Sequence, residues 1–111
     1  MKLPHAEEAI VDISKVRNYC LNPQHPRGKH KARVFKSALG LTQADAEDLK
    51  AKIEGIVLIA NCQAGEEDSH GQRFVVDFEI ERGGRSAPVR TSWIVKRGEE
   101  APRLTSCYIR E

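Results

Sequence analysis

The sequence predicts an α+β fold, in which two or three N-terminal helices pack on a three- to four-stranded antiparallel β-meander. Apolar residues recur at helical spacing over about residues 12–56, and they alternate with polar residues over about residues 73–110. Helices followed by strands along the chain are typical of an α+β plan. The 111 residues are 40% hydrophobic and 31% charged, which suits one globular core. We therefore expect a single domain over residues 1–111.

A first helix is predicted over residues 13–21. Asp12 is a suitable N-cap, and the pair Asn22-Pro23 ends the helix because proline disfavours helical backbone in the residue before it. The expected inner face consists of Ile13, Val16, Cys20 and Leu21.

Two further helices follow. One is predicted over residues 29–39 and stops at Gly40, since glycine accepts the left-handed conformation that ends many helices. Thr42 opens the next helix, with Asp45 three residues on as a variant of the capping box. Its expected inner face consists of Ala46, Leu49, Ile53 and Ile56.

Three strands account for the C-terminal part of the chain. In residues 74–81, apolar side chains alternate with a largely acidic set, which predicts one buried and one wet face. Gly83-Gly84 turns the chain into a second strand over residues 87–96. A turn over residues 98–102 then leads into a third strand over residues 104–110. Short connections of this kind predict an antiparallel meander.

The net charge of +2 hides an uneven distribution. Residues 13–44 contain no acid and seven of the 18 lysines and arginines, and the remaining eleven face all 16 acids, for a net charge of −5 outside that segment. A basic segment on an acidic body indicates that RNA or another polyanion is the partner. The seven bases are Lys15, Arg17, Arg27, Lys29, Lys31, Arg33 and Lys36.

Several classes of protein are disfavoured. No apolar run is long enough to span a membrane, and the N-terminus lacks the pattern of a secretory signal, so we expect a cytoplasmic protein without a membrane partner. Three distant cysteines disfavour a disulfide framework. The spacing of Cys20, His25 and His30 matches none of the usual zinc motifs, and the nearby cations oppose a divalent ion, so neither a metal nor another cofactor is expected.

The helix over residues 29–39 carries the densest set of candidate functional residues. On a helical wheel, Lys29, Arg33 and Lys36 share the side opposite the apolar stripe, and this basic face is either a rail for phosphates or an ordinary solvated surface. Lys31 falls on the apolar side of the first turn. Its ammonium must either extend past the helix end to water or lie in a cleft between helix and sheet.

Two histidines flank this basic turn. His30 lies between the apolar and basic faces, and the surrounding cations disfavour its protonated form, which suits a general base near neutral pH. The alternative is a surface histidine without a role. His25 either belongs to the same cleft or shapes the turn between two prolines, and the second interpretation is preferred.

The last strand places hydroxyl groups side by side. Ser106 and Tyr108 are two residues apart and are expected on one face together with Leu104, where they can orient a phosphate or simply meet water. The opposite face would carry Thr105, Cys107 and Ile109. Trp93 on the preceding strand is expected in the core, although an indole at a cleft can stack on a base.

The motif HPRGKHKARVFKSALGLT, followed by GQRFVVDFEI, TSWIVKRGEE and PRLTSCYI, resembles a family of small bacterial domains of unassigned function. Members occur as short free-standing proteins and as tails of large secreted polymorphic toxins. The resemblance covers nearly the whole chain and implies no particular activity.

A looser resemblance is to the superfamily of RNase toxins that includes barnase, EndoU, the tRNase colicins and RelE. Helices bearing His and Lys precede a meander there, and Ser106-Cys107-Tyr108 looks like the Thr-Ala-Tyr of EndoU-type toxin tails. The chain differs in having Ser for Thr, and one well-placed histidine where EndoU enzymes use two.

This second resemblance implies metal-independent RNA cleavage by attack of the ribose 2′-oxygen on the adjacent phosphate. His30 would be the base, and Lys31 and Arg33 would stabilise the charge on the phosphate. Ser106 and Tyr108 would position the phosphate or protonate the leaving oxygen. The flanking backbone would be bound by Arg27, Lys29, Lys36 and Trp93.

Three functions are therefore compared. The first is an RNase or toxin-like domain that acts on RNA such as tRNA, with a cognate immunity or antitoxin protein as a further partner. The second is a non-catalytic nucleic-acid-binding or adaptor module that uses the same helix. The third is an immunity or antitoxin protein, whose acidic sheet face would bind a basic enzyme.

Overall fold

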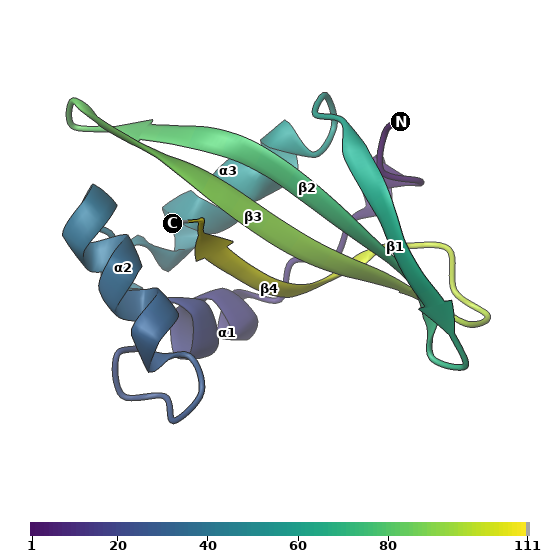
Figure 1. The fold of residues 1–111 in the computed structure, drawn as a ribbon, viewed down its shortest axis with the longest axis horizontal. Helices are drawn as coiled ribbons and strands as arrows, with labels where there is room; N and C mark the ends of the chain where they lie inside the picture. The colour runs from purple at the N-terminus through teal and green to yellow at the C-terminus, as the bar shows by residue number, and fades with distance from the viewer. Residues whose placement is uncertain (111) are drawn as a thin grey trace.

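A computed structural model describes residues 1–110 and shows an α+β fold with the helices ahead of the sheet (Figure 1). The helical part consists of η1 (Ala6–Glu8), α1 (Ile13–Lys15), η2 (Val16–Cys20), α2 (Lys29–Leu39), η3 (Gln43–Asp45) and α3 (Ala46–Ile56). The strands are β1 (Cys62–Asp68), β2 (Gly71–Arg82), β3 (Arg85–Lys96) and β4 (Arg103–Ile109). They form one antiparallel sheet in the order β1-β2-β3-β4, as expected for a meander.

The helices form where the sequence predicts them. Asp12 caps α1 by accepting a hydrogen bond from the Ser14 amide, and α1 runs on into η2, a π-helical segment that ends before Leu21. The bounds of α2 match the prediction, and Gly40 closes it in the left-handed conformation at φ 67°. The third helix begins with the 3-10 turn η3, where Thr42 and Asp45 form the expected capping box.

Helices and sheet share one core. Figure 1 shows α1 and α2 beside β4, with α3 passing behind β2 and β3. Phe35 of α2 and Trp93 of β3 are the largest side chains buried between them. The indole N–H of Trp93 donates to Thr91 Oγ1 at 2.8 Å, and Thr91 donates to the Val76 carbonyl at 2.9 Å, so the buried polar atoms of this region are satisfied.

Strand β1 was not recognised as a strand, because segment 65–71 reads as a polar turn. Of its seven residues, only Cys62 is buried, so the strand has no buried apolar face to produce a period of two. Pairing with β2 holds it in place, and the register shifts between Ala64 and Glu67. Sequence periodicity therefore failed on an exposed edge strand.

The register of strand β4 corrects a second prediction, namely which side chains share a face of the strand. Ser106 pairs with Ser92, but Leu104 pairs with Trp93, so Thr105 is an extra residue at a bulge. The bulge moves Leu104 to the core face, where it is 5% exposed, and leaves Thr105 exposed. The expectation that Leu104 shares a face with Ser106 and Tyr108 was wrong for this reason.

No helix in the described part of the chain is long and apolar enough to cross a membrane.

Candidate nucleic-acid interface

Lys31 joins the first turn of α2 to the last strand of the sheet. Its Nζ lies 4.9 Å from the centre of the Tyr108 ring and 5.6 Å from the centre of the Tyr19 ring, and it donates to the Tyr19 hydroxyl at 3.5 Å. The side chain is half-buried, so its ammonium lies between helix and sheet. The Tyr108 ring and the Tyr19 hydroxyl hold this charge while leaving N–H donors free for an anion.

Tyr19, at the end of η2, connects this contact to a second cation and a histidine. Lys15 Nζ lies 5.6 Å from the centre of the Tyr19 ring. The His25 ring meets Tyr19 edge to face, with the ring centres 4.8 Å apart and the planes at 81°. Tyr19 therefore contacts Lys15, Lys31 and His25 together.

His25 has a definite hydrogen-bonding state in this arrangement. Its Nδ1 accepts hydrogen bonds from the backbone N–H groups of Arg27 and Gly28, both at 3.0 Å. An imidazole nitrogen that accepts carries no proton, so Nε2 carries the proton of the neutral ring. His25 thus shapes the turn, as preferred from the sequence, and also presents an Nε2–H donor beside Tyr19.

These residues border an open groove of about 600 Å³, the Tyr19 groove. Its lining consists of Asp12, Ser14, Lys15, Asn18, Tyr19, His25, Arg27 and Thr105. Two of these residues are cations and one is an acid, and the Asp12 carboxylate already accepts the Ser14 amide. With Lys31 beside it, the groove has the charge and the donors of a phosphate-binding surface.

Tyr108 also borders a charged network on the open face of the sheet. It lies opposite Arg90 in β3, and Arg90 binds Asp77 through two hydrogen bonds of 2.8 and 2.9 Å. Arg110 adds a third bond to Asp77 at 3.2 Å. The hydrogen bonds from Arg90 lower the pKa of the Asp77 carboxyl, and Asp77 in turn raises the pKa of Arg90. Ser106 is half-buried on this same face.

The predicted catalytic residues do not all meet. Lys31 and Tyr108 are in contact, whereas His30 is exposed on the outside of the first turn of α2. Arg33 is two residues from Lys31 and so points about 160° away around the helix, at about 100° per residue. Arg33 and Lys36 instead line a separate hollow beside Leu21 and Thr42. Arg33 therefore lies on the wrong side of α2 to act with Lys31.

The residues predicted to bind the RNA backbone are also divided. Arg27 is exposed on the Tyr19 groove, while Lys29 begins the face that carries Arg33 and Lys36. Trp93 is 1% exposed and donates its N–H to Thr91. The prediction that Trp93 binds RNA was therefore wrong, because stacking on a base requires a ring face at the surface.

Two of the three cysteines, Cys20 and Cys107, are unsuited to thiol chemistry. Burial raises the pKa of the Cys20 thiol to about 11 and raises that of Cys107 well above its usual value. Thiols in such surroundings are inert. Both act as small core residues, as the sequence suggested.

Lys15 and Tyr19 were missed as site residues. The available signal was their spacing of four residues, which places them on one side of a helix, together with the position of Lys15 in the acid-free segment. What could not be seen is that Tyr19 meets Lys31 across the intervening turn.

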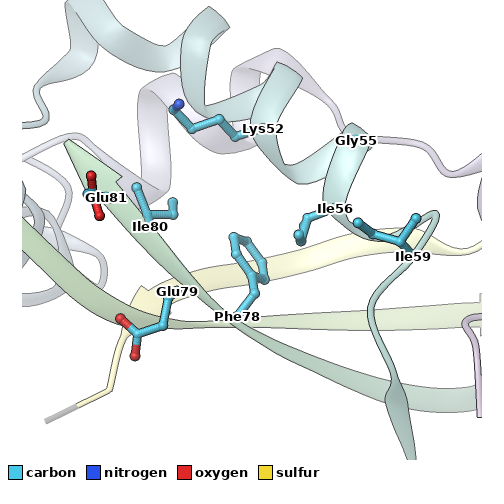
Figure 2. A pocket seen from close by; sticks show the side chains of 8 residues that line it. All are labelled: Lys52, Gly55, Ile56, Ile59, Phe78, Glu79, Ile80 and Glu81. Atoms are coloured by element: carbon cyan, nitrogen blue, oxygen red, sulfur yellow. The ribbon is translucent and has the colours of Figure 1, made fainter.

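A further groove lies between α3 and β2, away from these residues. Figure 2 shows the Phe78 ring pointing toward Ile56, with Ile59 at the groove's end and the Glu79 side chain directed away. The groove contains no histidine, cysteine or hydroxyl side chain. Its ionisable lining residues are Lys52, Glu79 and Glu81, and none of them belongs to the set predicted for RNA cleavage.

Comparison with known proteins gives a family and a fold. The protein family described as "Domain of unknown function (DUF6883)" matches residues 2–111 of the sequence. A chain in the solved "Contact-dependent growth inhibition toxin - immunity protein complex from Klebsiella pneumoniae 342" has a similar fold, with a TM-score of 0.68 and 10% sequence identity. The match covers 92% of this chain and 100% of that chain. No curated protein matches the sequence.

Proposed function

We propose that this chain, which belongs to the DUF6883 family of domains of unknown function, is a metal-independent endoribonuclease of the toxin type. The observation that carries the proposal is the contact between Lys31 of α2 and Tyr108 of β4 beside a basic groove. A cation, a phenol and a histidine donor lie together there, and these are groups that can bind a phosphate and stabilise charge developing on it.

Each residue of the site has its own role in the proposed cleavage of RNA. In this step the RNA strand reaches the exposed side of the first turn of α2, where His30, the residue before Lys31, takes the proton from a ribose 2′-hydroxyl. The 2′-oxygen then attacks the adjacent phosphorus. The bond from phosphorus to the 5′-oxygen breaks, which leaves a 2′,3′-cyclic phosphate, and the 5′-oxygen takes up a proton. Tyr108, assisted by Ser106, positions the phosphate or supplies that proton, while Lys31 stabilises the added negative charge.

His25 fits a second role in the same step. Its Nε2–H can donate to a phosphate oxygen, since its Nδ1 is occupied by the backbone amides of Arg27 and Gly28. Abstracting a proton at Nε2 would require the other tautomer and would break both of those bonds. His25 therefore serves as a donor, and the role of base remains with His30.

The fold similarity supports a place in a toxin and immunity system without choosing the side. The chain of similar fold belongs to a solved complex of a contact-dependent growth inhibition toxin and an immunity protein. The basic groove beside the contact of Lys31 with Tyr108 favours the toxin side for this chain. The open sheet face does not choose between the two sides, because Asp77 is bound to Arg90 and Arg110 whereas Glu79 and Glu81 of the same strand are exposed.

The decisive experiment incubates the purified chain with total tRNA, with and without a chelator. We expect cleavage under both conditions and products ending in 2′,3′-cyclic phosphate. His30→Ala should lower the rate by about 10²- to 10⁴-fold, the usual contribution of a general base. Lys52→Ala, which removes an exposed lysine of α3, is the matched control.

Each contrary outcome has a separate meaning. RNA left intact under every condition would overturn the nuclease proposal, and binding without cleavage would favour the adaptor function. Loss of cleavage with chelator would contradict the metal-independent mechanism. Full activity of His30→Ala would remove His30 from the mechanism while leaving the nuclease in place.

A further inference from the structure

The hollow on the other side of α2 is built differently from the Tyr19 groove. It has a volume of about 520 Å³, within the range of about 300–1,000 Å³ common for small-molecule sites. Its lining consists of Leu21, Pro23, Ala32, Arg33, Lys36, Leu41, Thr42, Gln43 and Ala44. The lining is largely apolar, it contains two cations, and no carboxylate belongs to it.

The two cations stand one turn apart at the rim. Arg33 and Lys36 are both exposed, and a step of three positions places them about 4.5 Å apart along the helix axis, at about 1.5 Å per residue. Lys29 continues the same face toward the start of α2. The carboxylate that follows the hollow along the chain, Asp45, is bound to Arg82 at 2.9 Å and to the Thr42 amide at 2.9 Å. It is therefore already neutralised from elsewhere.

The wall opposite α2 is fixed in position. Gln43 Nε2 donates to the Arg17 carbonyl at 3.0 Å, which ties η3 to the first helix and leaves the amide oxygen of Gln43 as an acceptor. Leu21 and Leu41 are buried at the floor. An apolar floor with an amide oxygen at one side and cations at the rim suits a base with its phosphate.

We propose that this hollow binds a nucleotide of the RNA strand that flanks the cleaved bond, with the base against the apolar floor and the phosphates on Arg33 and Lys36. The inference rests on the proposed RNA substrate and extends the contact from one side of α2 to the other. In this proposal the strand passes from the Tyr19 groove, which Arg27 lines, around the start of α2, where Lys29 begins the face that carries Arg33 and Lys36.

The test separates binding from cleavage by using a fluorescent 2′-O-methyl RNA oligonucleotide, which has no 2′-hydroxyl to attack phosphorus. Anisotropy titrations at several salt concentrations compare the wild type with Arg33→Ala/Lys36→Ala and with Lys52→Ala/Lys96→Ala, a control that removes two exposed lysines elsewhere. The first pair should weaken binding at least tenfold. It should also make the slope of log K against log salt shallower by about 1.4, at about 0.7 per phosphate contact of a single strand. The control pair should change both far less.

A second variant tests the hollow without removing a cation. Ala44→Glu places a carboxylate on its exposed rim and should weaken binding, whereas Ala51→Glu on the exposed side of α3 should not. Equal losses in each variant and its control would overturn the inference, because a general charge effect would then explain the binding.

Cleavage kinetics distinguish failure of this inference from failure of the nuclease. With cleavable RNA, Arg33→Ala/Lys36→Ala should raise KM at least tenfold and leave kcat within about twofold, since uniform binding energy alone is removed. An unchanged KM would overturn the inference while the nuclease stands. If the wild type cuts no RNA yet its binding to the methylated strand depends on Arg33 and Lys36, the nuclease falls and the hollow remains a nucleotide site.

Discussion

Lys31 and Tyr108 lie in contact, with the ammonium 4.9 Å from the centre of the ring, although they come from the beginning of α2 and the last strand. The Tyr19 hydroxyl accepts a hydrogen bond from the same ammonium at 3.5 Å. The structure therefore decides between the two positions expected for the Lys31 ammonium, past the helix end or in a cleft between helix and sheet. The side chain does not extend past the helix end into water alone, because it is half-buried between helix and sheet.

Replacing Lys31 tests the charge at this contact. Lys31→Met keeps the length of the side chain but removes the ammonium, and we expect RNA cleavage to fall by about 100-fold, the typical cost of losing one group that stabilises transition-state charge. The midpoint of thermal unfolding should change little, since the side chain is partly exposed. Lys52→Met on α3 should retain full activity, and equal activity of the two variants would contradict a role for Lys31.

The phenol of Tyr108 can be tested apart from its ring. Tyr108→Phe retains the ring face that contacts Lys31 and removes only the hydroxyl. We expect a fall in kcat of about 10²-fold or more, because the proton or hydrogen bond given to the phosphate is lost. A single-turnover rate constant equal to that of the wild type would show that the ring of Tyr108, without its hydroxyl, is sufficient for cleavage.

Gly28 links the turn at His25 to Tyr19. A Cβ atom at Gly28 would lie 2.3 Å from the Tyr19 carbonyl oxygen, so Gly28→Ala must push the start of α2 away from η2. We expect a loss of about 1–3 kcal/mol in the free energy of urea unfolding, as for other overpacked sites, together with reduced RNA cleavage. Gly55→Ala, where a Cβ meets nothing within 4 Å, should instead stabilise the chain by about 0.5–1 kcal/mol.

The ion pairs of Asp77 with Arg90 and Arg110 make the free energy of unfolding depend on pH. Hydrogen bonds from Arg90 hold the pKa of Asp77 below its value of about 3.9 in an unfolded chain. Its stabilising effect is therefore complete above that pH and is lost as the pH falls through the folded-state pKa. Asp77→Asn should cost about 1 kcal/mol at pH 7 and flatten the loss of stability between pH 4 and pH 2.

Denaturant titrations at a series of pH values measure this effect. Glu79→Gln, on the same face and hydrogen-bonded to Ser86, is the control. An acid dependence of Asp77→Asn identical to that of the wild type would contradict the assignment.

The buried hydroxyl of Thr91 is the clearest test of the core. Thr91→Val keeps the shape but leaves the indole N–H of the buried Trp93 without its partner, which should cost about 1–3 kcal/mol in urea unfolding. Ser92→Ala, next along β3 and on the open face, should cost much less. Equal losses would show that the indole finds another acceptor.

The sequence by itself determined the elements with strong local signals. The bounds of α2 follow from its apolar stripe and from Gly40, and the turn between β2 and β3 follows from Gly83-Gly84, both with positive φ. The alternation of buried and wet residues in β2 follows in the same way. These features depend on neighbours within one or two turns, so periodicity and backbone preference are sufficient to predict them.

Only the tertiary structure decided which candidate residues meet. It brought Lys31 to Tyr19 and Tyr108, and the bulge at Thr105 changed which side chains of β4 face the core. It also separated Arg33 from Lys31 and buried Trp93. Such contacts join segments far apart in the chain, and they are set by packing and by strand register, which the local pattern of a single sequence does not specify.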